Sequence, residues 1–166
     1  MKPSTTIIHA LAITLASVVA PPAWAASECR PVTGHFEASL VPPGTGHCPA
    51  AAPFCTAGRV WGGLQGDYQF VMTGATPSAP LGGVPTVLFF AGASDVTVTG
   101  GDHLFGTDTG SIDLPPGRGG FASLITFTGG TGAMANANGQ IALRGQFDAA
   151  SATTRGDYAG ELCTTP

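Results

Sequence analysis

Glu37 is the residue of this chain whose type and position most directly suggest acid–base chemistry. It lies in an alternating segment, residues 33–41, between the apolar residues Phe36 and Ala38. If the face that carries Glu37 points into an apolar interior, burial would raise the pKa of its carboxyl group and make it a candidate catalytic acid or base. The alternative is an exposed carboxylate between two buried neighbours. The pattern of this segment leaves both interpretations open.

Two histidines, His35 and His103, fall in segments whose pattern predicts strands. A nucleophilic triad would need a serine or cysteine and a carboxylate arranged around one of them. The sequence contains no G-x-S-x-G motif of the kind that presents a nucleophilic serine in many hydrolases. A single histidine on a strand is more typical of a structural role, and we assign it no catalytic function.

The glycine-rich run at residues 129–139 contains Gly130, Gly132 and Ala135 at the G-x-G-x-x-A spacing of dinucleotide-binding folds. That function needs a full helix after the glycines, a returning parallel strand and an acidic residue about 20 positions further on. Here a short turn leads into another alternating segment, and Asp148 is too near. The run therefore predicts a tight connection between antiparallel strands, and the chain is expected to need no cofactor.

A second run, residues 100–110, contains aspartates among glycines and weakly resembles one copy of a calcium-binding glycine/aspartate repeat. Such repeats bind calcium only when several copies stack, and the chain carries a single copy. We expect these aspartates to stabilise turns through side-chain hydrogen bonds, and we predict no metal site.

The four cysteines are Cys29, Cys48, Cys55 and Cys163. An even number in an exported chain predicts two disulfides, for which three pairings are possible. If the first strand pairs antiparallel with the last, Cys29 lies beside Cys163, while Cys48 and Cys55 close a short loop. This topology favours the pairs Cys29–Cys163 and Cys48–Cys55. A zinc site is the alternative, but the chain has no C-x-x-C spacing.

Residues 1–25 have the features of a cleaved secretory signal peptide. Lys2 supplies the positive charge, residues 7–20 are apolar, and Ala23-Trp24-Ala25 fits the cleavage motif. The apolar stretch is shorter than the roughly 20 residues that span a bilayer. We therefore expect an exported chain, residues 26–166, in the periplasm or outside the cell, with no membrane association after cleavage.

The composition excludes several classes of partner. The mature chain would have five arginines and no lysine against ten acidic residues, a formal charge of −5. Nucleic acids and anionic membranes bind clustered basic residues, so neither is an expected partner. Removing 25 residues from 166 leaves 141, which is enough for one domain with one core.

Alternating apolar and polar residues, separated by turn signals, predict an all-β fold. No amphipathic helix longer than residues 131–135 is expected. Residues 58–73 are expected to form one long strand, bent at Gly62 and Gly66. The almost continuously apolar residues 84–92 are expected to be buried on both faces or covered by a neighbour. The eight predicted strands are residues 33–41, 58–73, 84–92, 95–99, 103–114, 121–128, 140–148 and 154–163.

The last two of these strands predict a hairpin whose register can be read from the sequence. If its turn centres on residues 150–151, Arg144 lies opposite Asp157, and Gln146 lies opposite Arg155. Opposite charges paired across strands stabilise a sheet by about 0.2–1 kcal/mol. This charged face is expected to be an ordinary solvated surface.

Residues 128–132, with Ala137 and Gly139, resemble the G-G-T-G-x-F-x-x-A-x-G signature of the allene oxide cyclase barrel-like and dirigent-like proteins, particularly small exported bacterial members. Residues 106–110 and 156–163 are also similar to theirs, whereas Met134 stands where the family usually has an aromatic residue. The resemblance implies a single eight-stranded antiparallel barrel that commonly forms homo-oligomers. In plant relatives a cyclase holds an apolar epoxide, and dirigent proteins steer the coupling of phenol radicals. Their catalytic residues have no matching motif positions here.

An eight-stranded barrel has an interior that side chains fill or that holds one small ligand. We therefore expect an exported, disulfide-linked barrel that binds a small apolar or aromatic ligand or serves as a structural secreted module. The alternative is a cyclase or isomerase that uses the barrel cavity, with Glu37 as its acid or base. A homo-oligomer is a further expectation.

Overall fold

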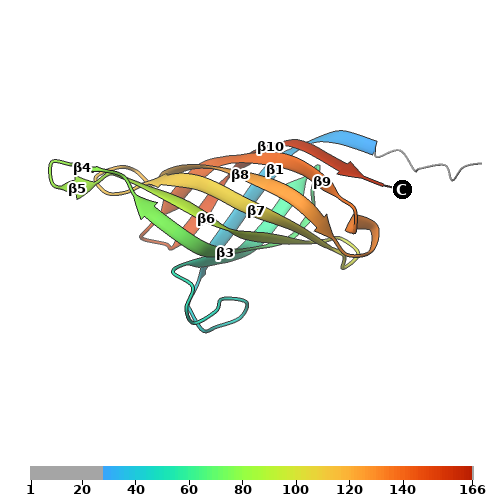
Figure 1. Ribbon diagram of the computed structural model, residues 1–166, viewed down its shortest axis with the longest axis horizontal. Coiled ribbons are helices and arrows are strands. Elements are labelled where there is room, and N and C mark those ends of the chain that lie inside the picture. Colours follow the sequence, from blue (N-terminus) through green and yellow to red (C-terminus); the bar gives the residue numbers. More distant parts are fainter. Residues whose placement is uncertain (1–27, 166) are drawn as a thin grey trace, which may run out of the picture.

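The computed structural model describes residues 28–165 and shows an all-β protein (Figure 1). Residues 1–25, the predicted signal peptide, lie outside the described residues. The elements are β1 (Glu28–Val41), β2 (Cys55–Gly62), β3 (Gly66–Pro77), β4 (Pro80–Leu81), β5 (Val84–Pro85), β6 (Val87–Val98), β7 (His103–Asp113), β8 (Gly120–Gly130), the short 3-10 helix η1 (Gly132–Met134), β9 (Asn138–Asp148) and β10 (Thr153–Thr164).

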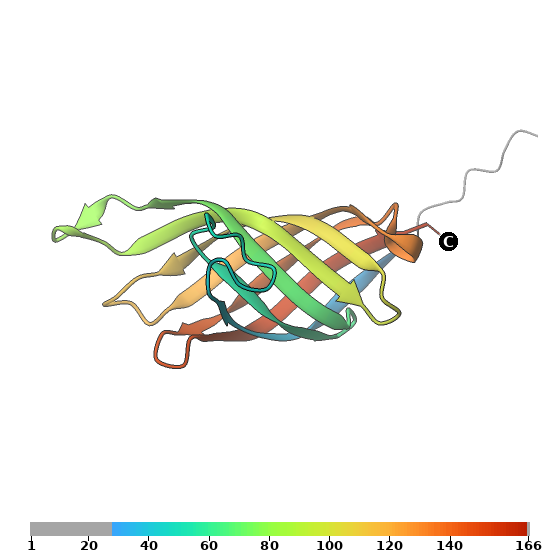
Figure 2. The same ribbon diagram turned by 90° about the horizontal axis from the view of Figure 1, so that it is seen from below.

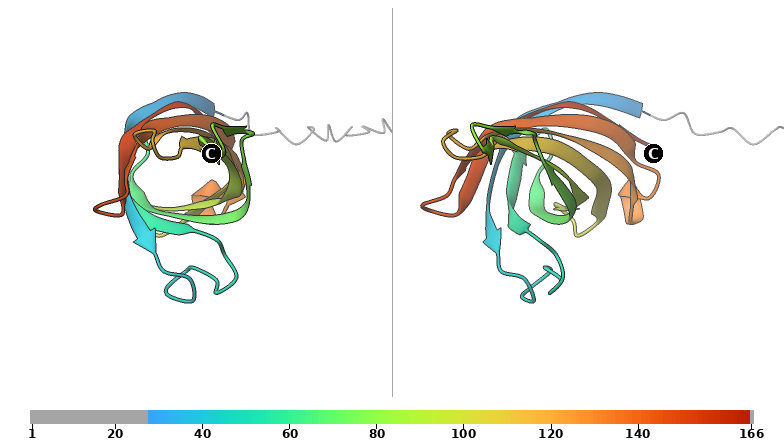
Figure 3. Two further views of the ribbon diagram at one scale, coloured as in Figure 1. Left: turned by 90° about the vertical axis from the view of Figure 1, so that its left-hand side faces the viewer. Right: turned by 60° about the vertical axis from the view of Figure 1, so that its left-hand side comes forward.

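Eight of the strands form a closed antiparallel barrel in the order β1-β10-β9-β8-β7-β6-β3-β2. Strand β1 completes the ring because it pairs with β10 on one side and with β2 on the other. The strands surround a common axis when the molecule is viewed from one end (Figure 3). The small β4–β5 hairpin lies outside the ring and joins β3 to β6. The predicted fold class is confirmed.

Alternation along each strand sorts side chains between the interior and the surface. In β1, for example, Val32, Phe36 and Ala38 are buried, and the residues between them are exposed or half-buried. The inward side chains of all eight barrel strands form one apolar core. The core follows from the period-two pattern that the sequence shows in these segments.

Two strand boundaries differ from the prediction, although the number of barrel strands is eight in both. Residues 58–73 form two strands, β2 and β3, because the chain reverses after Gly62, whose φ is +118°. The two strands predicted at residues 84–92 and 95–99 are largely one continuous strand, β6, which passes through Gly92, while residues 84–85 form β5. The glycines that suggested a bend in one long strand belong to a hairpin.

The apolar stretch at residues 84–92 is not buried on both faces. Val84 and Phe89 are 52% and 53% exposed, because β5 lies outside the barrel ring and Phe89 points outward from β6. Only the alternate residues of β6 face the core. The expectation of two-sided burial is therefore wrong for this segment.

Both predicted disulfides are present. Cys29 and Cys163 are direct register partners in β1 and β10, and their bond joins the two strands that close the barrel. Cys48 and Cys55 link the loop at residues 42–54 to the start of β2. Two disulfides are typical of an oxidising compartment such as the periplasm or the extracellular space.

The β9–β10 hairpin has the predicted register. Arg144 lies opposite Asp157, and Gln146 lies opposite Arg155. These side chains lie on the outer face of the barrel, since Leu143 and Tyr158 of the same strands are buried.

One end of the barrel is closed by a folded-in hairpin between β2 and β3. Leu64 in this hairpin is 4% exposed, and the hydroxyl of Tyr158 from β10 holds it in place. The Leu64 N–H donates to the Tyr158 hydroxyl at 2.8 Å, and that hydroxyl donates to the Leu64 carbonyl at 2.9 Å. The start of β1, the end of β10 and η1 also lie at this end, opposite the β4–β5 hairpin (Figures 1 and 2).

Replacing Tyr158 with phenylalanine is expected to lower the free energy of unfolding by about 2–6 kcal/mol. The ring remains, but a buried N–H and a buried carbonyl of Leu64 lose their partner, at about 1–3 kcal/mol for each unsatisfied group. Urea unfolding measures the loss. Tyr68→Phe is the matched control, because its hydroxyl has one long contact, 3.3 Å to Ser94 Oγ. Equal losses in the two variants would contradict the assignment of Tyr158 as the hairpin anchor.

Candidate functional site

The barrel is hollow at the end opposite the Tyr158 hairpin. A cavity of about 650 Å³ opens there, within the 300–1,000 Å³ range of typical small-molecule sites. Its mouth, as we define it, consists of the β7–β8 connection at residues 114–119 and the β9–β10 turn at residues 149–152, with Phe54 from the loop at residues 42–54 beside them. The view along the barrel from this end shows the loop extending to one side (Figure 3).

Six phenylalanine rings line the cavity wall. They occur in three edge-to-face pairs, with ring centroids 5.7 to 6.2 Å apart, which is a favourable geometry for aromatic contacts. The pairs are Phe36–Phe121, Phe54–Phe147 and Phe70–Phe90.

Two inward-facing glycines make room for these rings. A side chain at Gly92 would collide with the ring of Phe70, and one at Gly110 would collide with the ring of Phe90. Since glycine has no Cβ, the rings can lie directly against the backbone of β6 and β7. These two positions therefore set the shape of the wall on that side of the cavity.

The floor of the cavity contains a polar group formed by Tyr68, Asp108 and Ser123, and Ser94 lies beside them, outside the lining. Asp108 is only 3% exposed. Its Oδ2 accepts a hydrogen bond from Ser94 Oγ at 3.3 Å, and Ser94 Oγ lies 3.3 Å from the Tyr68 hydroxyl. Both contacts are longer than the typical O–H···O distance of about 2.7–2.8 Å. Asp108 Oδ1 is buried and has no hydrogen-bond partner.

The environment of Asp108 favours its protonated form. Burial raises the pKa of this carboxyl group to about 6, although the nearby hydroxyls of Ser123, Ser94 and Tyr68 act in the opposite direction. Burial also raises the pKa of Tyr68, with the charge of Asp108 adding to the effect, so the phenol stays neutral. Asp108 thus changes its charge close to physiological pH, which is a common property of functional carboxyl groups.

Glu37 does not line the cavity. It is exposed on β1, because its neighbours Phe36 and Ala38 take the inward positions. Its cross-strand neighbours on the outer face are Arg59 and Arg155. Of the two interpretations of Glu37, the structure gives the solvent-facing one, and the carboxyl group inside the barrel is that of Asp108.

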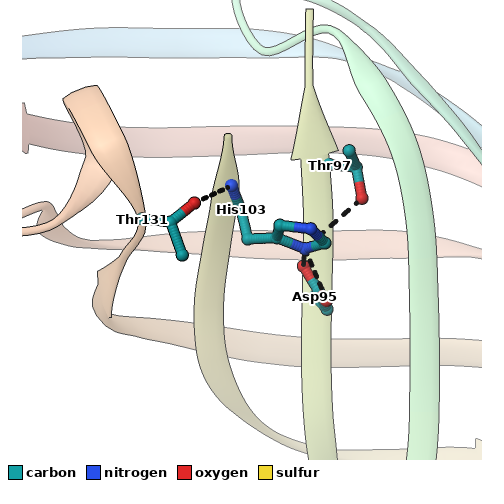
Figure 4. A network of polar contacts seen from close by, with 4 residues as sticks. All are labelled: Asp95, Thr97, His103 and Thr131. Atoms are coloured by element: carbon teal, nitrogen blue, oxygen red, sulfur yellow. Dashed lines mark hydrogen bonds and ion pairs between the residues drawn. The ribbon is translucent and has the colours of Figure 1, made fainter. Parts of the chain in front are cut away.

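The two strand histidines each pair with an aspartate on the outer face. His35 Nδ1 lies 2.5 Å from Asp157 Oδ1, and His103 Nδ1 lies 3.0 Å from Asp95 (Figure 4). Thr97 Oγ1 lies 3.5 Å from the same Nδ1 atom of His103. In a catalytic triad the nucleophile and the acid contact different ring nitrogens. The His103 arrangement is therefore no triad, and its backbone N–H donates to Thr131 Oγ1 at 2.9 Å.

The glycine-rich run joins β8 to β9 through the three-residue helix η1. Gly132, with a φ of +50°, lies against the carboxylate of Asp102, whose Oδ2 accepts a hydrogen bond from the Ala133 N–H at 2.9 Å. No parallel strand follows, because β9 pairs antiparallel with β8. The run is a barrel corner and lacks the geometry of a dinucleotide site.

One group of residues in the described part of the chain has metal-ligating atoms close together: Cys29, Glu161 and Cys163. The two sulfurs are joined in a disulfide, so neither is available as the thiolate that binds zinc. Among residues 28–165, no helix has the length and apolar character needed to cross a membrane.

Sequence reasoning missed Asp108 because it assigned the aspartates of residues 100–110 to turns, although it also predicted a strand over residues 103–114. Residues 106–110 lie in the middle of β7, where alternation places Leu104, Asp108 and Ile112 on one face. A carboxyl group on the apolar face of a strand was the signal that could have identified it.

Comparisons with known proteins add little to this description. No protein-family model matches the chain, and no curated protein does. Among solved structures, the chain is similar to the pterocarpan synthase dirigent protein GePTS1, over 83% of this chain and 86% of that one, at 12% identity and a TM-score of 0.35. A similarity this low says nothing about the site. The barrel fold is established by the strand pairing alone.

Proposed function

We propose that this protein binds a small, mainly apolar molecule with aromatic character in the open end of its barrel. The observation that carries the proposal is a cavity of about 650 Å³ whose wall is lined by phenylalanines and whose floor holds a single buried carboxyl group. Apolar surface favours burial of an apolar ligand, and a few polar groups in such a site orient the ligand.

The packing of the barrel supports a binding role over a purely structural one. A barrel of this size can be filled by side chains, and the end near Leu64 and Tyr158 is filled in this way. At the other end, glycines and serines replace larger residues at several inward positions, and the space remains open. Empty apolar volume costs stability, so a hollow end is the expected property of a binding protein.

We further propose that the chain is a small exported member of the allene oxide cyclase-like and dirigent-like barrels. Support comes from the Gly129–Gly139 signature, which coincides with the η1 corner, and from the two disulfides. The signal peptide and its removal belong to this proposal. N-terminal sequencing of protein recovered from the periplasm or the culture medium tests it: a start at Ala26 supports export, and an intact Met1 contradicts it.

Blocking the cavity is expected to abolish ligand binding. N-Phenylnaphthylamine, an uncharged aromatic probe, should bind the unmodified protein with an increase in fluorescence, as the probe enters apolar surroundings. Thr154→Trp places an indole inside the cavity, because Thr154 faces inward from β10. We expect this variant to bind the probe at least tenfold more weakly in a fluorescence titration.

The matched control is Ala159→Trp, which adds the same indole to the outer face of the same strand. It should bind the probe like the unmodified protein. Circular dichroism establishes that both variants are folded. Equal binding by Thr154→Trp and the unmodified protein would place the probe elsewhere and overturn the proposed site.

A cyclase or isomerase is the second candidate function, and one observation favours it. Asp108 is a buried acid with a pKa near 6, and a general acid works best when its pKa lies near the operating pH. In this version Asp108 takes the role that the sequence suggested for Glu37. The variant Asp108→Asn distinguishes the two functions. If the barrel is an enzyme, this variant should still bind the substrate but should no longer convert it.

A homo-oligomer also remains a proposal. Its support is a wide face of β6, β7 and β8 on which the outward residues from 105 to 111 and from 122 to 128 carry no charge. Phe89 and Leu124 are exposed there. Size-exclusion chromatography with light scattering tests the proposal, and a monomer at high concentration would overturn it.

A further inference from the structure

Among residues 28–165, no basic side chain balances the carboxyl group on the cavity floor. The basic residues at the cavity are Arg118 and Arg155, which are both exposed at the mouth, Arg155 on the outer face of β10, and Asp113 and Asp148 match them in number. The cavity lining contains no lysine or histidine. When Asp108 is ionised, the lining therefore carries one uncompensated negative charge.

The neighbours of Asp108 on each packed strand are neutral. Strand β3 presents Tyr68, whose phenol stays protonated, and β6 and β8 present the hydroxyls of Ser94 and Ser123. Asp108 Oδ1 is buried and has no hydrogen-bond partner, so no donor within the described residues compensates a charge on this oxygen. An ionised carboxylate in such a place needs a positively charged partner or must take up a proton.

Aromatic rings stand next to this carboxylate on the side of the mouth. Gly92 is the register partner of Asp108, and the ring of Phe70 occupies the space beside it. The ring of Phe90 lies over Gly110, two residues closer to the mouth. The faces of aromatic rings attract cations through their quadrupoles, and more strongly where water is excluded.

We propose that the ligand of this cavity is an organic cation, whose protonated amine lies against Asp108 and whose apolar body lies among the phenylalanines. The inference rests on the proposed function, because it names the ligand class of the same cavity. The ammonium group pairs with the carboxylate of Asp108, which lines the cavity, and charge-assisted hydrogen bonds of this kind are stronger than neutral ones. The negative net charge of the chain also favours the approach of cations.

The two possible ligand classes differ in the sign of their pH dependence. A cation requires the ionised carboxylate, so its binding strengthens as the pH rises through about 6, where Asp108 loses its proton. A neutral ligand that accepts a hydrogen bond from protonated Asp108 binds more weakly over the same rise. An alkylammonium group stays charged throughout this range. A change in its affinity with pH therefore comes from the ionisation of Asp108 and not from the ligand.

The test compares naphthylethylammonium with naphthylethanol, which has the same shape and also carries a hydrogen-bond donor but no charge. Calorimetric titrations at pH 7.5 and pH 5 measure both affinities. We expect the ammonium compound to bind at least tenfold more tightly than the alcohol at pH 7.5, and this preference to shrink at pH 5. Asp108→Asn should abolish the preference. The control Asp67→Asn removes one negative charge from the outer face, where Asp67 is exposed beside Arg59, and should keep it.

Three other results of these titrations would contradict either the cationic ligand or the proposed function. Equal binding of the two compounds at both pH values, or tighter binding of the alcohol, overturns the cation and leaves the proposed apolar site standing. A preference that persists in Asp108→Asn places the cation elsewhere and also overturns the inference. If neither compound nor the uncharged probe N-phenylnaphthylamine binds, the proposed function itself fails.

Discussion

Replacing Cys29 and Cys163 together with alanine is expected to lower the free energy of unfolding by about 5 kcal/mol. Their disulfide spans 134 residues of sequence, and cross-linking a chain over so long a loop removes much conformational entropy from the unfolded state. It also joins β1 to β10, the pair whose contact closes the barrel. Guanidinium unfolding under oxidising conditions measures the change.

The second disulfide is the matched control for this result. Cys48 and Cys55 are only seven residues apart, so the same argument predicts a loss of about 2.5 kcal/mol for their double alanine variant. The difference between the two variants isolates the effect of loop length. Equal losses, or a larger loss for Cys48 and Cys55, would contradict the view that the long-range bond is the main covalent support of the barrel.

Replacing Asp108 with asparagine is expected to stabilise the folded protein at neutral pH by about 3 kcal/mol. The pKa of the carboxyl group rises from 3.8 to about 6 on folding, and each unit corresponds to about 1.4 kcal/mol. At pH values well below 3.8 the carboxyl group is neutral in both states and costs nothing. As the pH rises to about 6, the unfolded chain ionises first, and above that value the full cost of the buried charge is present.

The measurement is the difference in unfolding free energy between Asp108→Asn and the unmodified protein at pH 4 and at pH 7.5. This difference should grow by about 2.5 kcal/mol between the two values, because the carboxyl group of the unfolded chain is already partly ionised at pH 4. Asp67→Asn, on the exposed outer face, serves as the control and should show little growth. A difference that is the same at both pH values would mean that Asp108 is not a strained, buried acid. Replacement of a functional residue often increases the stability of the folded protein, because such residues are kept for function at a cost in stability.

Local patterns in the sequence predicted an all-β fold and some of its strand pairing, while the resemblance to a barrel family implied the closed eight-stranded architecture. The register of the β9–β10 hairpin follows from alternation and a short turn, and the structure pairs Arg144 with Asp157 accordingly. The Cys29–Cys163 bond followed from the requirement that the first and last strands meet. Both predictions depend on antiparallel pairing, in which each position has a definite partner.

The site could not be predicted in the same way, because the hollow end depends on contacts that are distant in sequence. Leu64 fills one end of the barrel through Tyr158, 94 residues away. At the other end, Gly92 and Gly110 leave space for rings from β3 and β6. Alternation indicates which face is inward, but it does not indicate how much of the interior its side chains fill.

Asp108 and Glu37 show the same limit for individual residues. Each lies on a strand, but they lie on opposite faces of the barrel wall, Glu37 outside and Asp108 inside. The aspartates among the glycines of residues 100–110 were assigned to turns, whereas in β7 Gly106 and Gly110 are positions where neighbouring side chains pack against the backbone. The structure therefore assigns the buried carboxyl group to a residue that sequence reasoning had given a structural role.

The central claim is that a small apolar molecule enters the open end of the barrel, and methionine NMR tests it most directly. Besides Met1, the chain has two methionines: Met72 lines the cavity, and Met134 lies in η1 at the closed end. In protein labelled with carbon-13 at the methionine methyl groups, N-phenylnaphthylamine should shift the Met72 signal and leave that of Met134 unchanged. A bound probe that shifts Met134 and not Met72 would contradict the claim.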